Sequence, residues 1–262
     1  RMTTTTEIGI RARGLRAGYG GDVILDGVDV DIPKGAVTTV IGPNGCGKST
    51  LLKSLARTHP AEGSLHVDGR DVTSVARREL ARMVGMLPQS PLAPDGIVVA
   101  DLVSRGRHPH QSWLRQWSGS DEMEVAEALS LTGISDLAER PLSSLSGGQR
   151  QRVWISMVLA QQTPTLLLDE PTTYLDLAHA IDVLKLVGTL RDRLGRTVVM
   201  VLHDLNLAVR HSDHLVVMHE GAIAATGSPG QVLTEGLLAD VFGLDALIVE
   251  DPVAGGPLIV PR

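Results

Sequence analysis

A loop of closely spaced glycines that ends in a lysine and a serine has the composition of a phosphate-binding site. It reads Gly42-Pro43-Asn44-Gly45-Cys46-Gly47-Lys48-Ser49 and fits the pattern G-x-x-x-x-G-K-[ST]. The glycines allow backbone N–H groups to close on phosphate oxygens, and a helix that follows presents the positive end of its dipole to them. We expect Lys48 to reach the β- and γ-phosphates of a nucleotide, Ser49 to supply a hydroxyl to Mg²⁺, and Thr50 to lie near the α-phosphate.

Two adjacent carboxylates after an apolar run indicate how a bound phosphate is attacked. A phosphate loop alone does not separate kinases, GTPases and transport ATPases. Asp169 and Glu170 follow Leu166-Leu167-Leu168, which has the apolar character of a buried strand. At the end of such a strand Asp169 can face the metal, and Glu170 can hold a water in line with the γ-phosphate. We therefore predict that Glu170 is the general base and that Asp169 is a metal ligand together with Ser49.

A second glycine-rich turn has the features of an anion site but no phosphate of its own. The turn Ser146-Gly147-Gly148-Gln149 opens a segment with a helical pattern, and the N-terminus of a helix attracts anions. Within one chain the phosphates are already held by the first loop. A second subunit removes the difficulty, because it can offer its own bound phosphate to this turn.

The elements that must position these motifs alternate between strands and helices. Such alternation is expected for a largely parallel sheet covered by helices, so we predict the α/β class. Core strands are predicted at residues 35–41, 165–168 and 197–202, and a helix at 48–57 directly after the phosphate loop.

The remaining segments extend this core. The strand signal fades between Leu87 and Pro164, where helical patterns at 98–106, 121–132 and 147–162 predict an inserted helical subdomain. A hairpin is predicted at 215–225, a short helix after Ser228-Pro229, and two short strands within 246–262.

The motifs and their order resemble those of the ATP-binding cassette (ABC) ATPases. The run Leu145–Gln149, followed by Arg150-Gln151-Arg152, resembles their signature sequence, and the resemblance covers about residues 10–240. It implies a P-loop NTPase (RecA-like) core with an antiparallel β subdomain and an inserted α-helical subdomain at about 88–163. Together these would form an ABC ATP-binding domain at 2–240, followed by a short C-terminal extension at 241–262, with ATP and Mg²⁺ as ligands.

The resemblance also implies a dimer. In this family two ATPase domains sandwich two ATP molecules head to tail, so the Ser146–Gln149 turn would contact the γ-phosphate held by Lys48 of the partner subunit. The segment Leu175-Asp176 resembles the one that crosses the dimer interface, although Thr173 stands where many members carry Ser or Asn.

Three single residues match further positions of the family. Tyr19 resembles the aromatic residue that stacks on adenine, and Gln89 resembles the glutamine that senses both Mg²⁺ and the attacking water. His203 resembles the switch histidine, which would hydrogen-bond the γ-phosphate and hold the water activated by Glu170. The catalytic set implied in this way is Glu170, His203, Lys48 and Gln89.

One branch of the family fits best. The run Gly106-Arg107-His108-Pro109-His110-Gln111 and the run DEPTTYLD at 169–176 resemble ATPases that power import of ferric siderophores, haem or cobalamin. Residues 107–118, with Trp113 and Trp117, resemble the siderophore members more than the vitamin ones, as does the tail around 241–257. Ala180 departs from the Gln expected in this branch.

This branch implies further partners and a location. We expect two transmembrane permease subunits that contact the inserted helical region, an extracytoplasmic substrate-binding protein that acts through them, and a place on the cytoplasmic face of the cell membrane. The two tryptophans, spaced i and i+4, are predicted to pack on a helix beside the permease.

Composition excludes several other classes of protein. The net charge of −6 argues against nucleic acid as a partner, and no run of about 18 apolar residues predicts a membrane span. The single cysteine, Cys46, suits a reducing compartment and is expected to be a spectator among phosphate-binding groups rather than a nucleophile. His108 and His110 could bind a metal, but no cysteine or tight carboxylate cluster accompanies them.

Alternatives to siderophore import remain open at this stage. The cargo could be haem or cobalamin, or the chain could be a soluble ABC ATPase of iron-sulfur cluster assembly, which the permease-facing region disfavours. A DNA-repair ATPase needs a long coiled-coil insertion, for which the 96 residues between Lys48 and Leu145 leave too little room. A phosphotransferase would not require a second anion-binding turn such as Ser146–Gln149.

Overall fold

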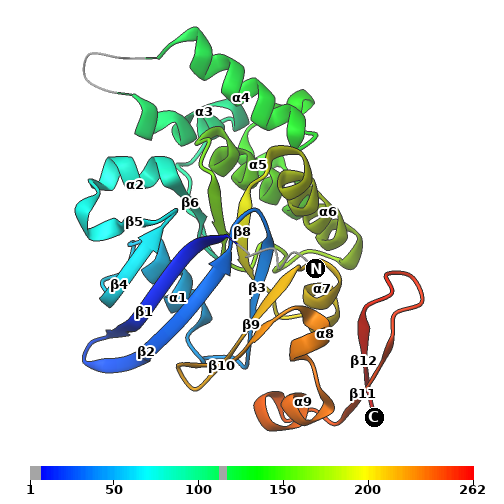
Figure 1. Cartoon of the computed structure of the whole chain (residues 1–262). Coiled ribbons are helices and arrows are strands. Elements are labelled where there is room, and N and C mark those ends of the chain that lie inside the picture. Colours follow the sequence, from blue (N-terminus) through cyan, green and yellow to red (C-terminus); the bar gives the residue numbers. More distant parts are fainter. Residues whose placement is uncertain (1–6, 112–116) are drawn as a thin grey trace.

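The computed structural model describes residues 7–111 and 117–262 and has a six-stranded sheet at its centre (Figure 1). The strand order is β10-β9-β3-β8-β7-β6, in which β10 is antiparallel and the other pairs are parallel. The strands are β3 (Val37–Ile41), β6 (Val84–Leu87), β7 (Thr165–Leu168), β8 (Thr197–Val201), β9 (His214–His219) and β10 (Ala222–Gly227). The predicted α/β class, core strands and hairpin are confirmed.

Both faces of the central sheet are buried, which explains why its strands are continuously apolar. Side chains alternate between the faces, so Leu166 and Leu168 pack in one hydrophobic core while Leu167 packs in the other. We call the core that contains Leu166 and Leu168 the first core and the one that contains Leu167 the second core. Helix α6 (Leu177–Leu194) packs in the first core, whereas helix α1 (Lys48–Leu55) and the antiparallel sheet pack in the second. The predicted helix at 48–57 is confirmed, although it ends two residues earlier.

An antiparallel sheet covers one side of the molecule. Its order is β2-β1-β4-β5, with β1 (Ile8–Tyr19), β2 (Asp22–Pro33), β4 (Glu62–Val67) and β5 (Arg70–Asp71). β1 and β2 form a long hairpin whose turn, Gly20-Gly21, has positive φ at both residues, as tight hairpin turns favour. This sheet matches the antiparallel β subdomain that the resemblance implies.

The segments between β6 and β7 that the structure describes are helical and lie together above the central sheet in Figure 1. They comprise α3 (Val99–Ser104), α4 (Gly119–Leu131), α5 (Gly147–Ala160) and the 3-10 helices η2 (Arg105–His110), η3 (Ser135–Leu137) and η4 (Leu142–Ser144). Leu102, Val125 and Trp154 pack in the first core, so these helices are continuous with the sheet. A further helix, α2 (Arg77–Met83), precedes β6, after the 3-10 helix η1 (Val72–Ser74).

Trp117 lies beside helices, as predicted, since it lines a cavity with residues of α3 and α4, but it is not itself part of a helix. Trp113 lies outside the described residues, and Trp117 precedes α4 instead of lying in a helix. The physical reason is the capping box of Ser118 and Asp121, which starts the helix after Trp117. The indole N–H of Trp117 donates to Glu122 Oε1 at 3.3 Å.

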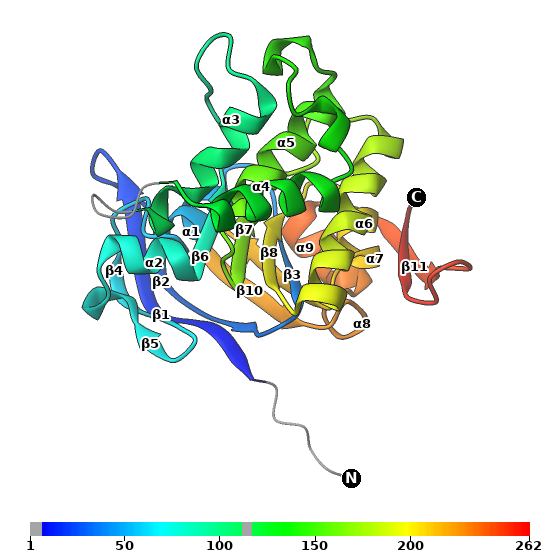
Figure 2. The ribbon, with the colours of Figure 1, turned by 90° about the horizontal axis from the view of Figure 1, so that it is seen from above.

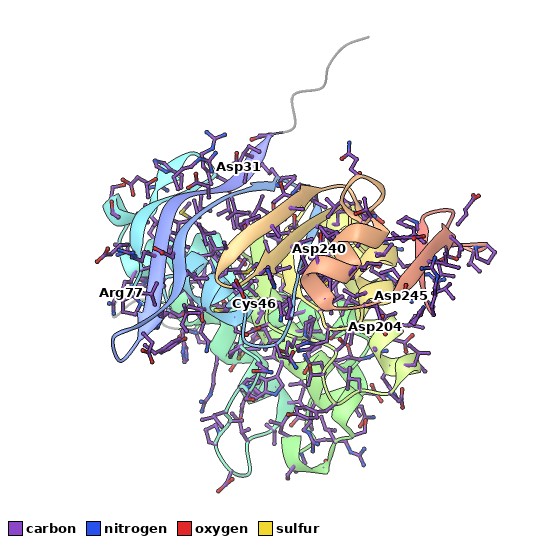
Figure 3. The ribbon with its side chains drawn as sticks, turned by 90° about the horizontal axis from the view of Figure 1, so that it is seen from below. Asp31, Cys46, Arg77, Asp204, Asp240 and Asp245 are labelled. Atoms are coloured by element: carbon purple, nitrogen blue, oxygen red, sulfur yellow. The ribbon has the colours of Figure 1, made fainter. Side chains whose placement is uncertain are left out.

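The C-terminal segments form a small unit on the side opposite the antiparallel sheet (Figure 2). It contains α7 (Leu205–Arg210), α8 (Pro229–Val232), α9 (Glu235–Phe242), β11 (Ala246–Glu250) and β12 (Pro257–Pro261). The Asn206 side chain bonds both backbone groups of Ile259, and Arg210 pairs with the buried Asp251. The two predicted short strands are confirmed, and Asp245 marks the start of their hairpin in Figure 3.

Among the described residues no helix combines the length and the apolar character that a membrane crossing requires.

Candidate functional site

The glycine loop between β3 and α1 is compact because two of its glycines have no room for a side chain. A Cβ on Gly42 would lie 2.2 Å from the carbonyl oxygen of Met218, and one on Gly47 would lie 2.9 Å from Leu25 Cδ2. Gly47 has φ 103° and caps α1 without a side-chain hydrogen bond. The start of α1 therefore opens into the loop, as an anion site at a helix N-terminus requires.

Lys48 bridges the loop from within. Its Nζ donates to the carbonyl oxygens of Gly42 and Pro43, each at 2.8 Å, and the residue is 6% exposed. The ammonium group is thus already held at the centre of the predicted phosphate site. Cys46, which lies near the centre of the molecule in Figure 3, is buried, and burial raises the pKa of its thiol, so the side chain stays neutral.

A cavity of about 480 Å³ opens next to this loop and collects most of the predicted residues. It is lined by Tyr19, Ile24, Asn44, Gly45, Gly47, Lys48, Ser49, Thr50, Gln89, Glu170 and His203. Gly42, Pro43 and Cys46 shape the loop without lining the cavity. Ile24 was not predicted, since an aliphatic residue in a strand carries no signal of ligand contact.

Asp169 lies at the end of β7, 2% exposed, and binds the loop through Ser49. The Ser49 hydroxyl donates to Asp169 Oδ1 at 2.9 Å, whereas Oδ2 is buried and has no hydrogen-bond partner among the described residues. Burial raises the pKa of Asp169, and the Ser49 hydrogen bond opposes this shift. An unpaired buried carboxylate oxygen is costly, so the pair suits a cation that prefers oxygen ligands.

Glu170 is held by three donors. Gln89 Nε2 donates to Oε2 at 2.7 Å, Thr173 Oγ1 donates to the same oxygen at 2.8 Å, and His203 Nε2 lies 2.6 Å from Oε1. Burial raises the pKa of the carboxyl, but the hydrogen bonds from Thr173, His203 and Gln89 outweigh it and leave the pKa below its ordinary value. Glu170 is therefore ionised at neutral pH and can accept a proton.

The parallel register explains why these residues meet. Leu87, Leu168 and Met200 are neighbours across β6, β7 and β8. Gln89 and Glu170 each follow two residues later, and His203 follows three residues later, so all three side chains leave the same edge of the sheet. Ligands of such folds collect at the carboxyl ends of the strands.

The second predicted anion site is kept apart from the cavity. Ser146 caps α5 in a reciprocal capping box with Gln149, and neither residue lines the cavity beside Lys48. Gly148 packs so closely against His179 that a Cβ would lie 2.7 Å from the imidazole, while Ser146 and Gly147 are exposed. The structure thus places Ser146–Gln149 near the start of α6 and outside the cavity that contains Lys48 of the same chain.

His59 is a residue of the site that the sequence did not reveal. Its ring lies 4.2 Å from the ring of Tyr19 at a tilt of 32°, and its Nε2 contacts the carbonyl oxygen of Gly18 at 2.9 Å. The residue follows α1, 40 positions away in the sequence from Tyr19, and no motif includes it. Tyr19 is 47% exposed, so its outer face is open to the cavity while His59 fixes the inner one.

We predict that His59→Leu weakens ATP binding by about two- to tenfold, the worth of one aromatic pair. Without the imidazole ring of His59, the Tyr19 ring loses an aromatic contact and is held less firmly in the orientation that stacks on the base. Fluorescent-nucleotide titration of the purified chain measures the dissociation constant, with the exposed His108→Leu as the matched control. An unchanged constant would show that Tyr19 needs no support from His59.

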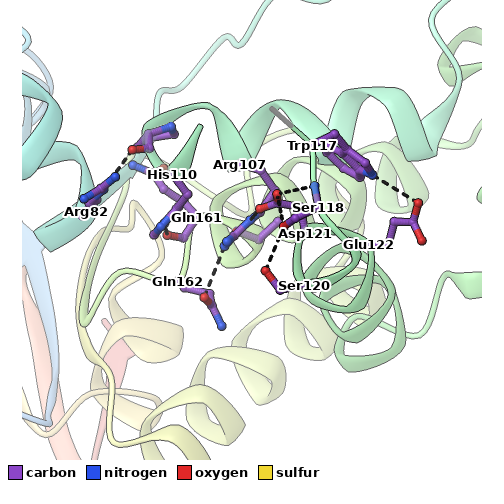
Figure 4. A network of polar contacts seen from close by, with 12 residues as sticks. Arg82, Arg107, His110, Trp117, Ser118, Ser120, Asp121, Glu122, Gln161 and Gln162 are labelled. Carbon is purple, nitrogen blue, oxygen red and sulfur yellow. Dashed lines mark hydrogen bonds and ion pairs between the residues drawn. The ribbon is translucent and has the colours of Figure 1, made fainter. Parts of the chain in front are cut away.

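The run Gly106–Gln111 is partly internal (Figure 4). Gly106 packs against the carbonyl oxygen of Met157, where a Cβ would lie at 2.0 Å, and Arg107 forms a buried ion pair with Asp121 at 2.8 Å. His110 Nε2 contacts the carbonyl oxygen of Gln161, and His108 is exposed. Of the residues predicted to face a partner, Gly106 and Arg107 instead hold the helical region together. The described residues contain no group of three or more His, Cys, Asp or Glu side chains that could hold a metal ion.

Comparison with known proteins gives a consistent result. A family model described as ABC transporter matches residues 25–173. The achromobactin transport ATP-binding protein CbrD of Dickeya dadantii (strain 3937) is 52% identical over 96% of this chain and 94% of its own length. The ferric enterobactin transport ATP-binding protein FepC of Escherichia coli (strain K12) is 48% identical over 98% of this chain and 96% of its own length.

Solved structures agree with the sequence relatives. A metal-chelate type ABC transporter in an inward-facing conformation superimposes with a TM-score of 0.84 at 29% identity, covering 97% of both chains. A dimeric bacterial ABC transporter cassette superimposes with a TM-score of 0.74 at 25% identity, covering 84% of this chain and 98% of that one.

Proposed function

The chain belongs to the ABC transporter ATPases, and on this premise we propose that it hydrolyses ATP to drive import of a ferric siderophore. The observation that carries the hydrolysis is the meeting of Lys48, Glu170 and His203 in one cavity. The cargo is supported by the relatives, which are named for transport of achromobactin and of ferric enterobactin and match almost the whole chain.

The nucleotide is proposed to lie between Tyr19 and the start of α1. Its base stacks on the outer face of Tyr19, and its phosphates accept hydrogen bonds from Lys48 and from the N–H groups of the glycine loop. Mg²⁺ would be held by Ser49 and Asp169, with Gln89 nearby, and when bound it would neutralise charge on the β- and γ-phosphates. The unpaired Asp169 Oδ2 supports this assignment.

Hydrolysis depends on charge and position at the edge of the sheet. Glu170 accepts the proton of the attacking water at its carboxylate, and His203 holds that water and the γ-phosphate in place. Lys48 stabilises the negative charge that builds up on the phosphate oxygens. Gln89 links this event to the helical region, because it lies between β6 and α3.

The active unit is proposed to be a dimer with the two sites at its interface. Ser146–Gln149 lies apart from Lys48 of its own chain, so it has a phosphate to bind only when a second copy supplies one. The similarity to a dimeric cassette supports this arrangement. Two permease subunits, a substrate-binding protein outside the cell and a location on the cytoplasmic face of the membrane complete the proposal.

The test of the cargo is uptake of radiolabelled iron, supplied as the siderophore native to the source cells, by iron-starved cells. Lys48→Ala should lower uptake at least tenfold, since each hydrogen bond from the charged group to a phosphate is worth about 1.5–3 kcal/mol. The matched control is Lys185→Ala, which removes an exposed lysine from α6.

Two contrary outcomes can be told apart. Suppose that uptake is normal in the Lys48→Ala cells, that no second transporter is present and that the purified variant has lost ATP hydrolysis. This outcome would support the proposed ATPase site but exclude the siderophore as its cargo. Haem and cobalamin uptake would then be measured in the same cells. Undiminished hydrolysis by the purified variant would contradict the proposed site itself.

A further inference from the structure

Thr173 is the partner of Glu170 that no part of the proposed mechanism uses. Its hydroxyl donates to Glu170 Oε2 at 2.8 Å, and its backbone N–H donates to the carbonyl oxygen of Glu170 at 3.2 Å. Thr173 therefore closes a turn on Glu170, whose φ of 52° is unusual for a residue with a side chain. A strained residue at a functional site persists only when its surroundings fix it.

We propose that Thr173 is a positioning residue that holds the Glu170 carboxylate in its reactive orientation while Gln89 and His203 are free to engage ATP. This inference rests on the proposed ATPase function. It assigns to Thr173, which lies two residues before the segment Leu175-Asp176 predicted to cross the dimer interface, a role in orienting the base.

The three donors to Glu170 differ in how firmly they are tied to it. Gln89 reaches Oε2 from the loop after β6, and His203 reaches Oε1 from the end of β8 with its side chain 46% exposed. Both have a proposed task on the nucleotide or on its water, and both come from other strands. Thr173 is three residues from Glu170 in the same turn, so it stays in place when the other two donors change partner.

The electrostatic setting makes a fixed donor valuable. Glu170 is buried, with its side chain 8% exposed, and burial raises the pKa of its carboxyl. The Thr173 hydrogen bond is the strongest influence in the opposite direction.

The geometry also separates Thr173 from the nucleotide. It does not line the cavity beside Lys48 but a second cavity of about 320 Å³ on the other side of Glu170 and His203, toward the start of α6 and α7. Loss of its hydroxyl should therefore change the chemical step and not the binding of ATP.

The test is steady-state ATP hydrolysis by the purified full chain as a function of ATP concentration, with Thr173→Val, Thr173→Ala and Thr173→Ser. We expect kcat to fall about tenfold in the Val and Ala variants, the worth of one hydrogen bond to a charged group, with KM for ATP unchanged. Thr173→Ser keeps a hydroxyl at this position and should restore kcat.

The matched control is Thr172→Val, which removes the same hydroxyl group from the neighbouring threonine. Thr172 lines the same second cavity but does not hydrogen-bond Glu170. Thermal unfolding checks that each variant is folded. An unchanged kcat in Thr173→Val and Thr173→Ala, a Ser variant as slow as the Val variant, or a rise in KM at constant kcat would each overturn the proposal. A wild-type chain without ATPase activity would instead refute the proposed function.

Discussion

Replacing Glu170 with Gln should reduce ATP turnover at least about a hundredfold while leaving ATP-dependent dimers intact. Gln keeps the shape of the side chain and can still hydrogen-bond Thr173 and His203, but it cannot accept a proton from water. The cavity beside Lys48 and the Ser146–Gln149 turn are unchanged, so two copies can still close on two ATP molecules. Without hydrolysis the closed dimer should accumulate.

Two measurements check this result together. Phosphate release gives the turnover number, and size-exclusion chromatography with light scattering gives the fraction of dimer with and without MgATP. Glu139→Gln makes the same substitution at an exposed position and should behave as wild type. Hydrolysis at the normal rate in the Glu170→Gln variant would remove Glu170 as the general base, and loss of the dimer would show that the carboxylate also holds the interface.

The part of the site that the sequence predicts is the part built from contiguous residues. The phosphate loop at 42–49 could be predicted because its glycines, its lysine and the helix that binds the anion at its N-terminus are adjacent in the sequence. Asp169, Glu170 and His203 could be placed at one edge because each follows a predicted apolar strand, and parallel strands end together, whereas Gln89 is assigned by the family resemblance alone. For the residues other than Gln89, the position in the sequence is enough to predict the position in the fold.

The residues that sequence did not predict act across the fold. His59 supports Tyr19 from the far end of α1, and Ile24 enters the cavity from the hairpin of β1 and β2. Neither of these two contacts has a period or a spacing, since each depends on how separate elements pack. Thr173 lies only three residues from Glu170, but the hydrogen bond between its hydroxyl and Glu170 depends on the turn at residues 170–173, which no motif in the sequence indicates.

For Arg107 the sequence predicts exposure, whereas the structure shows a buried side chain. A charged residue in a run of His, Pro and Gln is ordinarily solvated, and Arg is almost never fully buried unless it is paired. Here Asp121 supplies the pair from α4, and Arg107 also donates to the carbonyl oxygen of Ala160 and to Gln162 Oε1. The guanidinium thereby joins η2, α4 and the end of α5, as Figure 4 shows.

This pair makes Asp121→Asn the substitution with the largest expected effect on stability. The side chains of Arg107 and Asp121 are 5% and 4% exposed, and removal of one member of a buried pair costs about 3–5 kcal/mol, because the remaining charge is left uncompensated. Asp121 accepts from Arg107 through Oδ1 and from the N–H and hydroxyl of Ser118 through Oδ2, so Asn, with a single acceptor oxygen, cannot serve both the ion pair and the capping box of α4. Urea unfolding at pH 7 measures the difference in free energy of unfolding.

The loss of unfolding free energy caused by Asp121→Asn should become smaller at acid pH. Burial raises the pKa of Asp121, but the hydrogen bonds from Arg107 and Ser118 outweigh it, so the folded-state pKa lies below its ordinary value. Stability gained from a depressed carboxyl pKa is complete above the unfolded value of about 3.9 and is lost as the pH falls through the folded value. The gap between wild type and Asp121→Asn should therefore stay constant from pH 7 to pH 5 and narrow as the pH falls further.

The surface pair of Arg152 and Asp182 provides the matched comparison. These side chains lie 3.1 Å apart but are 29% and 48% exposed, so Asp182→Asn should cost no more than about 1 kcal/mol. An equally small cost for Asp121→Asn would mean that the helical region does not depend on the buried pair. A large cost that stays the same when the pH is lowered well below the unfolded pKa of about 3.9 would assign it to the capping of α4 and not to the charge. The expected pattern, a large cost that fades in acid, would identify Arg107 as the residue that joins η2 to the two helices, leaving the exposed His108 of the same run available to a partner.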